Sequence, residues 1–173
     1  MKTVIVLAAH GSPPRDMPRA ELAEFFTLHA RLESSPVSHS PALESRYEEL
    51  ADQVKRWPRT PQNDPFHAAT YELARKLGAE TGLEVEVGFN EFCSPDVGEA
   101  IAAAAGGGAG KIVVITTMLT RGGEHAERDI ARAVEEARRR WPGVNIVYAW
   151  PFDTDEIVRF LAGHVGRFVQ DAA

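Results

Sequence analysis

The hydrophobic positions of this chain gather into four short runs, separated by longer segments in which apolar residues recur at helical spacing. The runs cover residues 3–9, 83–89, 111–119 and 144–148, and most are rich in valine and isoleucine. Near-continuous apolarity is typical of strands buried on both faces, as in a parallel sheet. The pattern predicts an α/β protein in which four strands form a parallel sheet with right-handed helical crossovers.

Helix signals lie between and after these runs. Asp64 and Ser94 each precede a proline. Asp and Ser are favoured as helix N-caps, and proline is favoured at the first position of a helix. Thr154 is a candidate N-cap of the same chemical type. Residues 124–141 form an amphipathic segment, in which Ile130, Val134 and Ala137 lie on one apolar stripe. The predicted helices cover residues 65–81, 95–105, 124–141 and 154–168.

One long segment does not fit a minimal alternation of strands and helices. Residues 13–64 hold two further helical patterns, at about 19–33 and 41–57. We interpret the segment as a helical insertion in a single domain of residues 1–173. Because it follows the first strand, it should lie near any cleft at the carboxyl end of that strand. A surface decoration or a contact between subunits is the alternative interpretation.

The composition of the chain limits the binding partners and the cellular compartment that we expect for the protein. A chain of 173 residues is long enough for one sizeable core, and its formal charge of −6 argues against binding to nucleic acid, which needs a positive surface. The single cysteine, Cys93, cannot form an internal disulfide and fits a reducing compartment. No apolar stretch is long enough to span a bilayer. We therefore expect a cytoplasmic protein without a membrane partner.

Two histidines stand just beyond buried strands. His10 closes the first apolar run, and His125 follows the third run after a Gly122-Gly123 pair. Ligands of open α/β sheets bind at the carboxyl ends of the strands. Glu91, which follows the second run, adds a carboxylate to the same edge. Two imidazoles and a carboxylate can take up a divalent metal or exchange protons.

Neighbouring residues support this candidate site. The turn at Gly11-Ser12 can present free N–H groups to an anion, and Asp129 lies one helical turn after His125, where it could orient the imidazole. Each feature has a structural alternative, namely an ordinary turn and a solvated start of a helix. The remaining four histidines are interpreted as surface or packing residues, although one of them lies in the insertion: His29, His39, His67 and His164.

Two other types of site are excluded by the pattern. The glycine-rich segment 106–111 ends a predicted helix and precedes a strand, whereas a phosphate-binding loop follows a strand and opens a helix. No GxGxxG motif follows the first strand, so a dinucleotide site is not expected. Cys93 is interpreted as a small buried residue rather than a metal ligand.

Taken in order, these segments resemble the small class II tetrapyrrole chelatases, the CbiX-type sirohydrochlorin chelatases, which are distant relatives of ferrochelatase. The resemblance rests on three segments, at residues 10–12, 88–101 and 111–130. It implies a chelatase-like (flavodoxin-like) three-layer fold with a four-stranded parallel sheet. It also implies ATP-independent insertion of Co²⁺ or Fe²⁺, with Ni²⁺ as a further candidate, into a sirohydrochlorin-type macrocycle in cobalamin or siroheme biosynthesis. It also implies a homodimer and no organic cofactor.

The resemblance assigns roles to individual residues. His10 and His125 would bind the metal and accept pyrrole protons, and Glu91 would assist in metal delivery or proton removal. The substrate carries many carboxylates, so local cations must offset the negative charge of the protein. The predicted substrate-binding residues are Gly11, Ser12, Arg15, Arg121 and Gly123, with Arg19 and Arg128 as further nearby cations.

Two alternatives remain open on the sequence. The first is a non-catalytic protein that binds metal or tetrapyrrole in the same cleft. The second is a different enzyme built on a flavodoxin-like sheet, because a fold does not by itself specify an activity.

Overall fold

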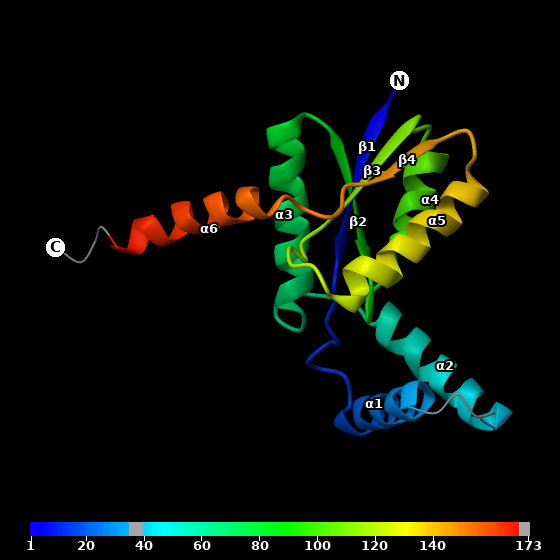
Figure 1. The fold of residues 1–173 in the computed structure, drawn as a ribbon. Helices are drawn as coiled ribbons and strands as arrows, with labels where there is room; N and C mark the ends of the chain where they lie inside the picture. The colour runs from blue at the N-terminus through cyan, green and yellow to red at the C-terminus, as the bar shows by residue number, and fades with distance from the viewer. Residues whose placement is uncertain (35–39, 170–173) are drawn as a thin grey trace.

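The sheet is the four-stranded parallel sheet that the apolar runs predict. The computed structural model describes residues 1–34 and 40–169, so His39 lies outside the described residues. The strands run in the order β2-β1-β3-β4 (Figure 1). Their bounds are β1 Thr3–Ala9, β2 Glu84–Phe89, β3 Lys111–Thr116 and β4 Asn145–Tyr148. The third strand ends three residues earlier than predicted, because the chain turns away from the sheet at Thr117.

Strand β1 lies at the centre and is the most deeply buried. Its last six residues are all buried, because it pairs with β2 on one side and with β3 on the other. Side chains alternate between the two faces of the sheet. Val4 and Val6 point to one face and Leu7 to the other, and each face forms its own hydrophobic cluster. The apolar run of residues 3–9 is explained by this burial on both faces.

Helices cover the two faces unequally. On one face α4 (Val97–Gly106) and α5 (Ile130–Arg140) pack over the sheet, and the predicted stripe of Ile130, Val134 and Ala137 is buried there. On the other face α3 (Pro65–Thr81) packs along β2 through Ala74 (Figure 1). The last helix, α6 (Thr154–Val169), extends away from the sheet and has no buried residue.

The predicted start of one helix and the predicted capping residue of another need correction. Helix α4 begins at Val97 rather than Pro95, because Asp96 accepts a hydrogen bond from the Glu99 amide while the Glu99 side chain accepts one from Asp96. This reciprocal capping box satisfies two amides that would otherwise lack partners. In α6 the capping side chain belongs to Asp153, which accepts hydrogen bonds from the amides of Asp155 and Glu156.

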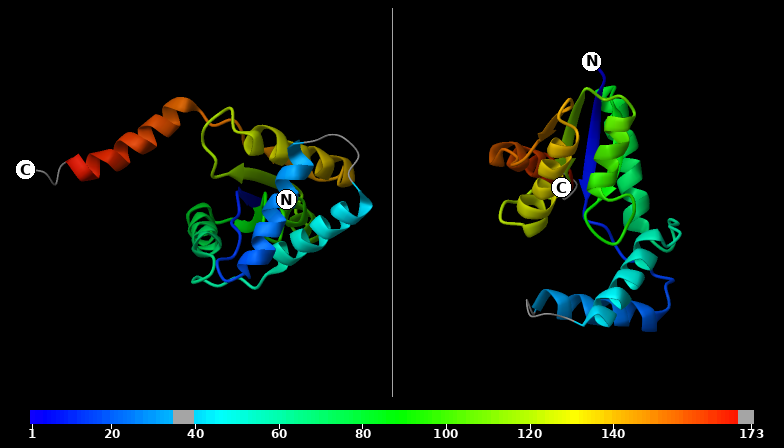
Figure 2. Two further views of the ribbon diagram at one scale, coloured as in Figure 1. Left: turned by 90° about the horizontal axis from the view of Figure 1, so that it is seen from below. Right: turned by 90° about the vertical axis from the view of Figure 1, so that its right-hand side faces the viewer.

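The predicted insertion forms a helical hairpin of α1 (Arg19–Ser34) and α2 (Pro41–Arg56). It lies beyond the carboxyl ends of the strands (Figures 1 and 2). The hairpin has a small hydrophobic core of its own, made by Met17, Phe25, Leu50 and Val54, against which Phe92 packs. The residue that follows Glu91 therefore belongs to the hairpin core, which places the insertion beside the candidate site.

A buried ion pair fastens the hairpin to the sheet. The Arg59 guanidinium donates to the Asp64 carboxylate at 2.7 Å, and these side chains are 6% and 0% exposed. The same guanidinium donates to the carbonyls of Ser12 at 2.6 Å and Phe92 at 2.5 Å. One side chain thus joins the segments that follow β1 and β2. In the described part of the chain, no helix has the length and apolar character needed to cross a membrane.

Candidate metal centre

Three side chains of the types that bind metal ions follow the ends of three strands and lie at one edge of the sheet. His10 follows β1 directly, and Glu91 stands two residues after β2. His125 begins η1 (His125–Asp129), a single π-helical turn that joins the loop after β3 to α5. Their ligand atoms all lie within 4.8 Å of one another. Among the described residues, these three form the one group of three or more His, Cys, Asp or Glu side chains that are close enough together to hold a metal ion.

Glu91 stands between the two imidazoles. One of its carboxylate oxygens lies 3.8 Å from His10 Nε2 and the other lies 3.7 Å from His125 Nε2. The two imidazole rings meet edge to face, with their centroids 4.8 Å apart. The side chains of His10, Glu91 and His125 are 43%, 24% and 29% exposed. An ion can therefore reach this set from solvent, and the three side chains leave room for further ligands.

The backbone after β1 and β2 holds His10 against Glu91. The ladder continues past the strand ends, because the Asn90 amide donates to Ala9 O and the Glu91 amide donates to His10 O, both at 2.8 Å. Gly11 has a φ of +105°, and a Cβ built there would lie 1.9 Å from Glu91 O. Only glycine allows both this backbone conformation and this close approach.

We expect Gly11→Ala to lower the free energy of unfolding by at least about 2 kcal/mol and to weaken Co²⁺ binding, because the added Cβ pushes Glu91 away from His10. Gly122→Ala is the matched control. Gly122 also has a positive φ, of +84°, but a Cβ there would meet nothing within 4 Å. Urea unfolding and Co²⁺ titration of both variants separate the steric effect from backbone strain. Equal losses in the two variants would contradict the role given to the Gly11 contact.

The orientation of His125 is set by its neighbours. Its Nδ1 lies 2.8 Å from the Asp129 carboxylate and 2.9 Å from the Asn90 amide nitrogen. Burial alone would raise the pKa of Asp129, but hydrogen bonds from His125 and Asn90 outweigh it and lower that pKa. The ionised carboxylate accepts the Nδ1 proton, which leaves the Nε2 lone pair directed toward Glu91.

Removing the carboxylate in Asp129→Ala should weaken Co²⁺ binding about 10- to 100-fold, because the imidazole loses the partner that fixes its tautomer. Glu124→Ala is a control on the neighbouring turn, where Glu124 forms an exposed ion pair with Arg128. Isothermal titration with Co²⁺ checks both variants. An unchanged affinity in Asp129→Ala would exclude this orienting role.

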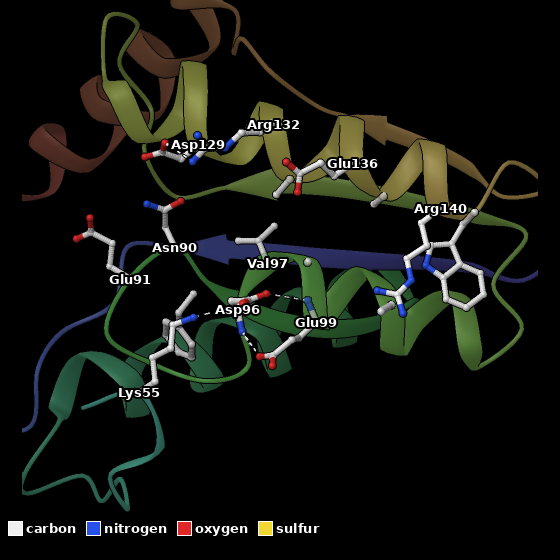
Figure 3. Close-up of a pocket in the computed structure, with 16 residues that line it drawn as sticks. Lys55, Asn90, Glu91, Asp96, Val97, Glu99, Asp129, Arg132, Glu136 and Arg140 are labelled. Atoms are coloured by element: carbon white, nitrogen blue, oxygen red, sulfur yellow. Dashed lines mark hydrogen bonds and ion pairs between the residues drawn. The ribbon is translucent and has the colours of Figure 1, made fainter. Parts of the chain in front are cut away.

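A long groove opens beside the metal centre between α4 and α5 (Figure 3). It has a volume of about 790 Å³, and Figure 3 shows Glu91 and Asp129 at one end and Arg140 at the other. Both acidic and basic side chains line its walls. The ionisable residues that line it are Lys55, Glu91, Asp96, Glu99, Asp129, Arg132, Glu136 and Arg140.

The five predicted substrate-binding residues do not line this groove. Ser12 presents its carbonyl to Arg59, and Gly123 accepts the Glu127 amide as part of the turn before η1. The positive φ at this turn belongs to Gly122 rather than Gly123. Arg15 and Arg121 are exposed in the loops that follow β1 and β3. Their part in binding stays a prediction, as does that of Gly11.

Sequence reasoning missed several residues around the centre. Lys55 and Arg132 bring cations to the groove, where they pair with Asp96 at 3.4 Å and Asp129 at 3.3 Å. Phe92 has a positive φ of 60°, and its ring centroid lies 6.3 Å from that of His10. No local pattern marks these residues, because three separate elements bring them together.

One comparison with known proteins identifies a family. The sequence profile of the CbiX family matches residues 62–163, which includes Glu91 and His125 but not His10. A search of the curated proteins found no match. Among solved structures, the putative cobalamin (vitamin B12) biosynthesis CbiX protein from Marinobacter aquaeolei VT8 is 16% identical. That match covers 99% of both chains with a TM-score of 0.53.

Two structures of the sirohydrochlorin chelatase SirB also match. SirB from Bacillus subtilis subspecies spizizenii in complex with cobalt is 18% identical over 87% of this chain and 44% of that chain, with a TM-score of 0.44. SirB from Bacillus subtilis with Fe³⁺ is 20% identical over 91% of this chain and 43% of that one, with a TM-score of 0.47. The chain thus spans less than half the length of SirB. Because the profile covers more than half of the sequence, the chain belongs to the CbiX family.

Proposed function

We propose that this protein inserts Co²⁺ or Fe²⁺ into a sirohydrochlorin-type tetrapyrrole, as a step of cobalamin or siroheme biosynthesis. The observation that carries the proposal is the convergence of His10, Glu91 and His125 in a member of the CbiX family. Imidazole and carboxylate ligands suit Co²⁺, Fe²⁺ and also Ni²⁺. The metal ion is a substrate of this reaction, and no organic cofactor is required.

The three side chains meet the first requirement of metal insertion, which is to hold an ion without trapping it. Neutral imidazoles bind through Nε2 of His10 and His125, and Glu91 supplies an oxygen ligand between them. Two or three protein ligands leave coordination positions for water and for the incoming pyrrole nitrogens. The partial exposure of all three side chains favours release of the ion to the macrocycle.

The second requirement is the removal of two pyrrole protons. A base must lie within hydrogen-bond reach of the N–H group, and a pKa near the working pH favours both uptake and release of the proton. His10, His125 and Glu91 are free to accept these protons once the ion has moved to the pyrrole nitrogens. The same residues therefore serve as metal ligands before transfer and as bases during it.

The groove between α4 and α5 offers a place for the macrocycle beside the ion. Its volume of about 790 Å³ falls in the usual range for small-molecule sites. Lys55, Arg132 and Arg140 can pair with carboxylates on the rim of the ring, with Arg15 and Arg121 as further candidates. Glu99 and Glu136 line the same groove, so the ring must approach in an orientation that places its carboxylates against the cations.

We further propose that the reaction needs no ATP and takes place in the cytoplasm on a homodimer. The glycine-rich segment at residues 106–110 closes α4 and leads into β3, so it does not have the place of a phosphate-binding loop. The single cysteine, Cys93, is buried and fits a reducing compartment.

The test is an absorbance assay of sirohydrochlorin with Co²⁺, Fe²⁺ or Ni²⁺, with and without the protein and in the absence of ATP. We expect at least one metal to be inserted well above the uncatalysed rate, with many product molecules formed per protein chain. Binding of metal or tetrapyrrole that stops at one equivalent, with no turnover, would instead favour the non-catalytic binding protein.

A further inference from the structure

Two aromatic side chains connect the helical hairpin to the metal centre. Phe92 follows Glu91 directly in the chain, and its ring centroid lies 6.3 Å from that of His10. Phe26, which belongs to α1, has its ring centroid 5.9 Å from that of Phe92. The three rings of His10, Phe92 and Phe26 therefore form a continuous row that leads from a proposed metal ligand onto the hairpin. We call Phe26 and Phe92 the aromatic pair.

Phe26 is not needed by the hydrophobic core of the hairpin. Its neighbour Phe25 is only 3% exposed and packs in that core with Leu50 and Val54. Successive residues of a helix point about 100° apart, and Phe26 is accordingly 40% exposed. A single exposed apolar side chain is ordinary on a protein surface. Apolar side chains grouped beside a polar site are instead typical of ligand-binding sites.

The position of Phe92 is held by its surroundings. Its φ of 60° is uncommon for a bulky residue, and such a backbone conformation persists only where neighbouring contacts hold it. The Arg59 guanidinium donates to the Phe92 carbonyl at 2.5 Å, and the ring of Phe25 meets the ring of Phe92 edge to face at 6.1 Å. The aromatic pair is thus fixed relative to Glu91, as a preorganised binding surface requires.

The hairpin also brings a positive charge to this side of the metal centre. Lys55, on α2, lines the groove to which Glu91 belongs. Figure 3 shows its ammonium group directed toward Asp96, and the two groups lie 3.4 Å apart with side chains 40% and 38% exposed. An ion pair this exposed is weak, so Lys55 can exchange Asp96 for a carboxylate of a ligand. One element therefore supplies both flat apolar surface and a cation.

We propose that the hairpin is a substrate-binding element, in which the aromatic pair contacts the apolar ring of the tetrapyrrole while Lys55 pairs with a carboxylate on its rim. The inference rests on the proposed function, because the ligand it names is the macrocycle that receives the metal. A macrocycle centred on the ion extends beyond its nitrogens on every side, so one edge reaches the groove and another reaches the hairpin. Aromatic side chains favour contact with such a flat, conjugated ring.

The first test measures the binding of sirohydrochlorin to the full chain without any metal, followed by the fluorescence of the macrocycle. We expect Phe26→Ala to weaken binding at least about 5-fold, because removing an aromatic ring from a stacked nucleobase costs about 5- to 150-fold. Phe66→Ala is the matched control. Phe66 is also 40% exposed but belongs to α3, on the opposite face of the sheet from α4 and α5. Equal affinities in the two variants overturn the proposal.

Two further measurements separate contact with the macrocycle from a disturbance of the site. Phe26→Trp keeps an aromatic ring at the same position and should bind sirohydrochlorin nearly as tightly as the wild type. Phe26 provides no metal ligand, so Phe26→Ala should bind Co²⁺ with unchanged affinity. If Phe26→Trp binds as weakly as Phe26→Ala, or if Co²⁺ binding falls together with sirohydrochlorin binding, the aromatic pair does not have the role proposed. Circular dichroism verifies the folding of each variant.

The insertion assay keeps this inference separate from the proposed function. Loss of a contact that is made equally before and during the reaction raises KM and leaves kcat unchanged. We therefore expect Phe26→Ala to raise the KM for sirohydrochlorin by the factor found in the binding experiment, with kcat close to that of the wild type. An active wild type together with an unchanged KM in Phe26→Ala would overturn the inference alone. Weakened binding in Phe26→Ala together with a wild type that shows no turnover would overturn the proposed function alone.

Discussion

His10→Ala and His125→Ala should each reduce the rate of metal insertion by at least about 100-fold while leaving the fold intact. Each substitution removes a ligand nitrogen and a base in one step, and general base catalysis alone contributes about 100- to 10,000-fold. The fold should survive because both imidazoles are partly exposed and contribute little to either hydrophobic cluster. Initial rates with sirohydrochlorin and Co²⁺, with circular dichroism as the folding control, provide the measurement.

A third histidine serves as the matched control for these variants. His29 lies in the hairpin, stacks on Phe25 at a centroid distance of 5.8 Å, and does not belong to the group of ligand-type side chains. His29→Ala should keep most of the insertion rate even if it loses some stability. Normal activity in His10→Ala or in His125→Ala would show that the assigned roles are wrong.

Arg59→Met should lower the free energy of unfolding by about 3–5 kcal/mol. The cost is large because the substitution leaves the Asp64 carboxylate buried without its counter-ion, and it also deprives the carbonyls of Ser12 and Phe92 of a donor. Against a typical total of about 5–15 kcal/mol, such a loss threatens the folded state itself. Urea denaturation monitored by tryptophan fluorescence gives the value.

Two further variants make this prediction specific. Arg56→Met breaks an ion pair with Asp52 in which both side chains are more than half exposed, and it should cost less than about 1 kcal/mol. Adding Asp64→Asn to Arg59→Met removes the stranded charge and keeps an acceptor for the His67 amide at the start of α3. The double variant should therefore recover part of the loss. If Arg59→Met and Arg56→Met cost the same, the buried pair does not fasten the hairpin.

The convergence of the three ligand-type residues could be predicted from the sequence because it follows from the topology. Parallel strands end at a common edge, so residues placed just beyond three apolar runs must lie near one another. The same reasoning could not give the order β2-β1-β3-β4, since the runs alone do not state which strand is central.

The start of α4 shows a limit of local signals. Ser94-Pro95 has the composition of a helix start, but Asp96 and Glu99 together satisfy two amides and move the first turn to Val97. The capping box was present in the sequence and could have been found by its spacing. The helix begins at Val97 because the hydrogen bonds between Asp96 and Glu99 satisfy the amides of its first turn.

The Arg59–Asp64 pair and the exposure of α6 could not be predicted from the sequence for a different reason. Arg59 stands in a proline-rich connector and looks like any surface cation until the hairpin, the segment after β1 and Phe92 close around it. The apolar stripe of α6 predicts a buried helix, and its exposure is visible only once the sheet is built. Both features depend on contacts between elements that are distant along the chain.

The central claim is that an ion held by His10, Glu91 and His125 is the ion that enters the macrocycle. Stopped-flow absorbance of the cobalt-loaded protein mixed with sirohydrochlorin tests it in a single turnover. We expect the ligand-field bands of bound Co²⁺ to disappear at the rate at which the bands of the metallated macrocycle grow. Metallation that leaves the bound-cobalt bands unchanged, or no metallation at all, would contradict it.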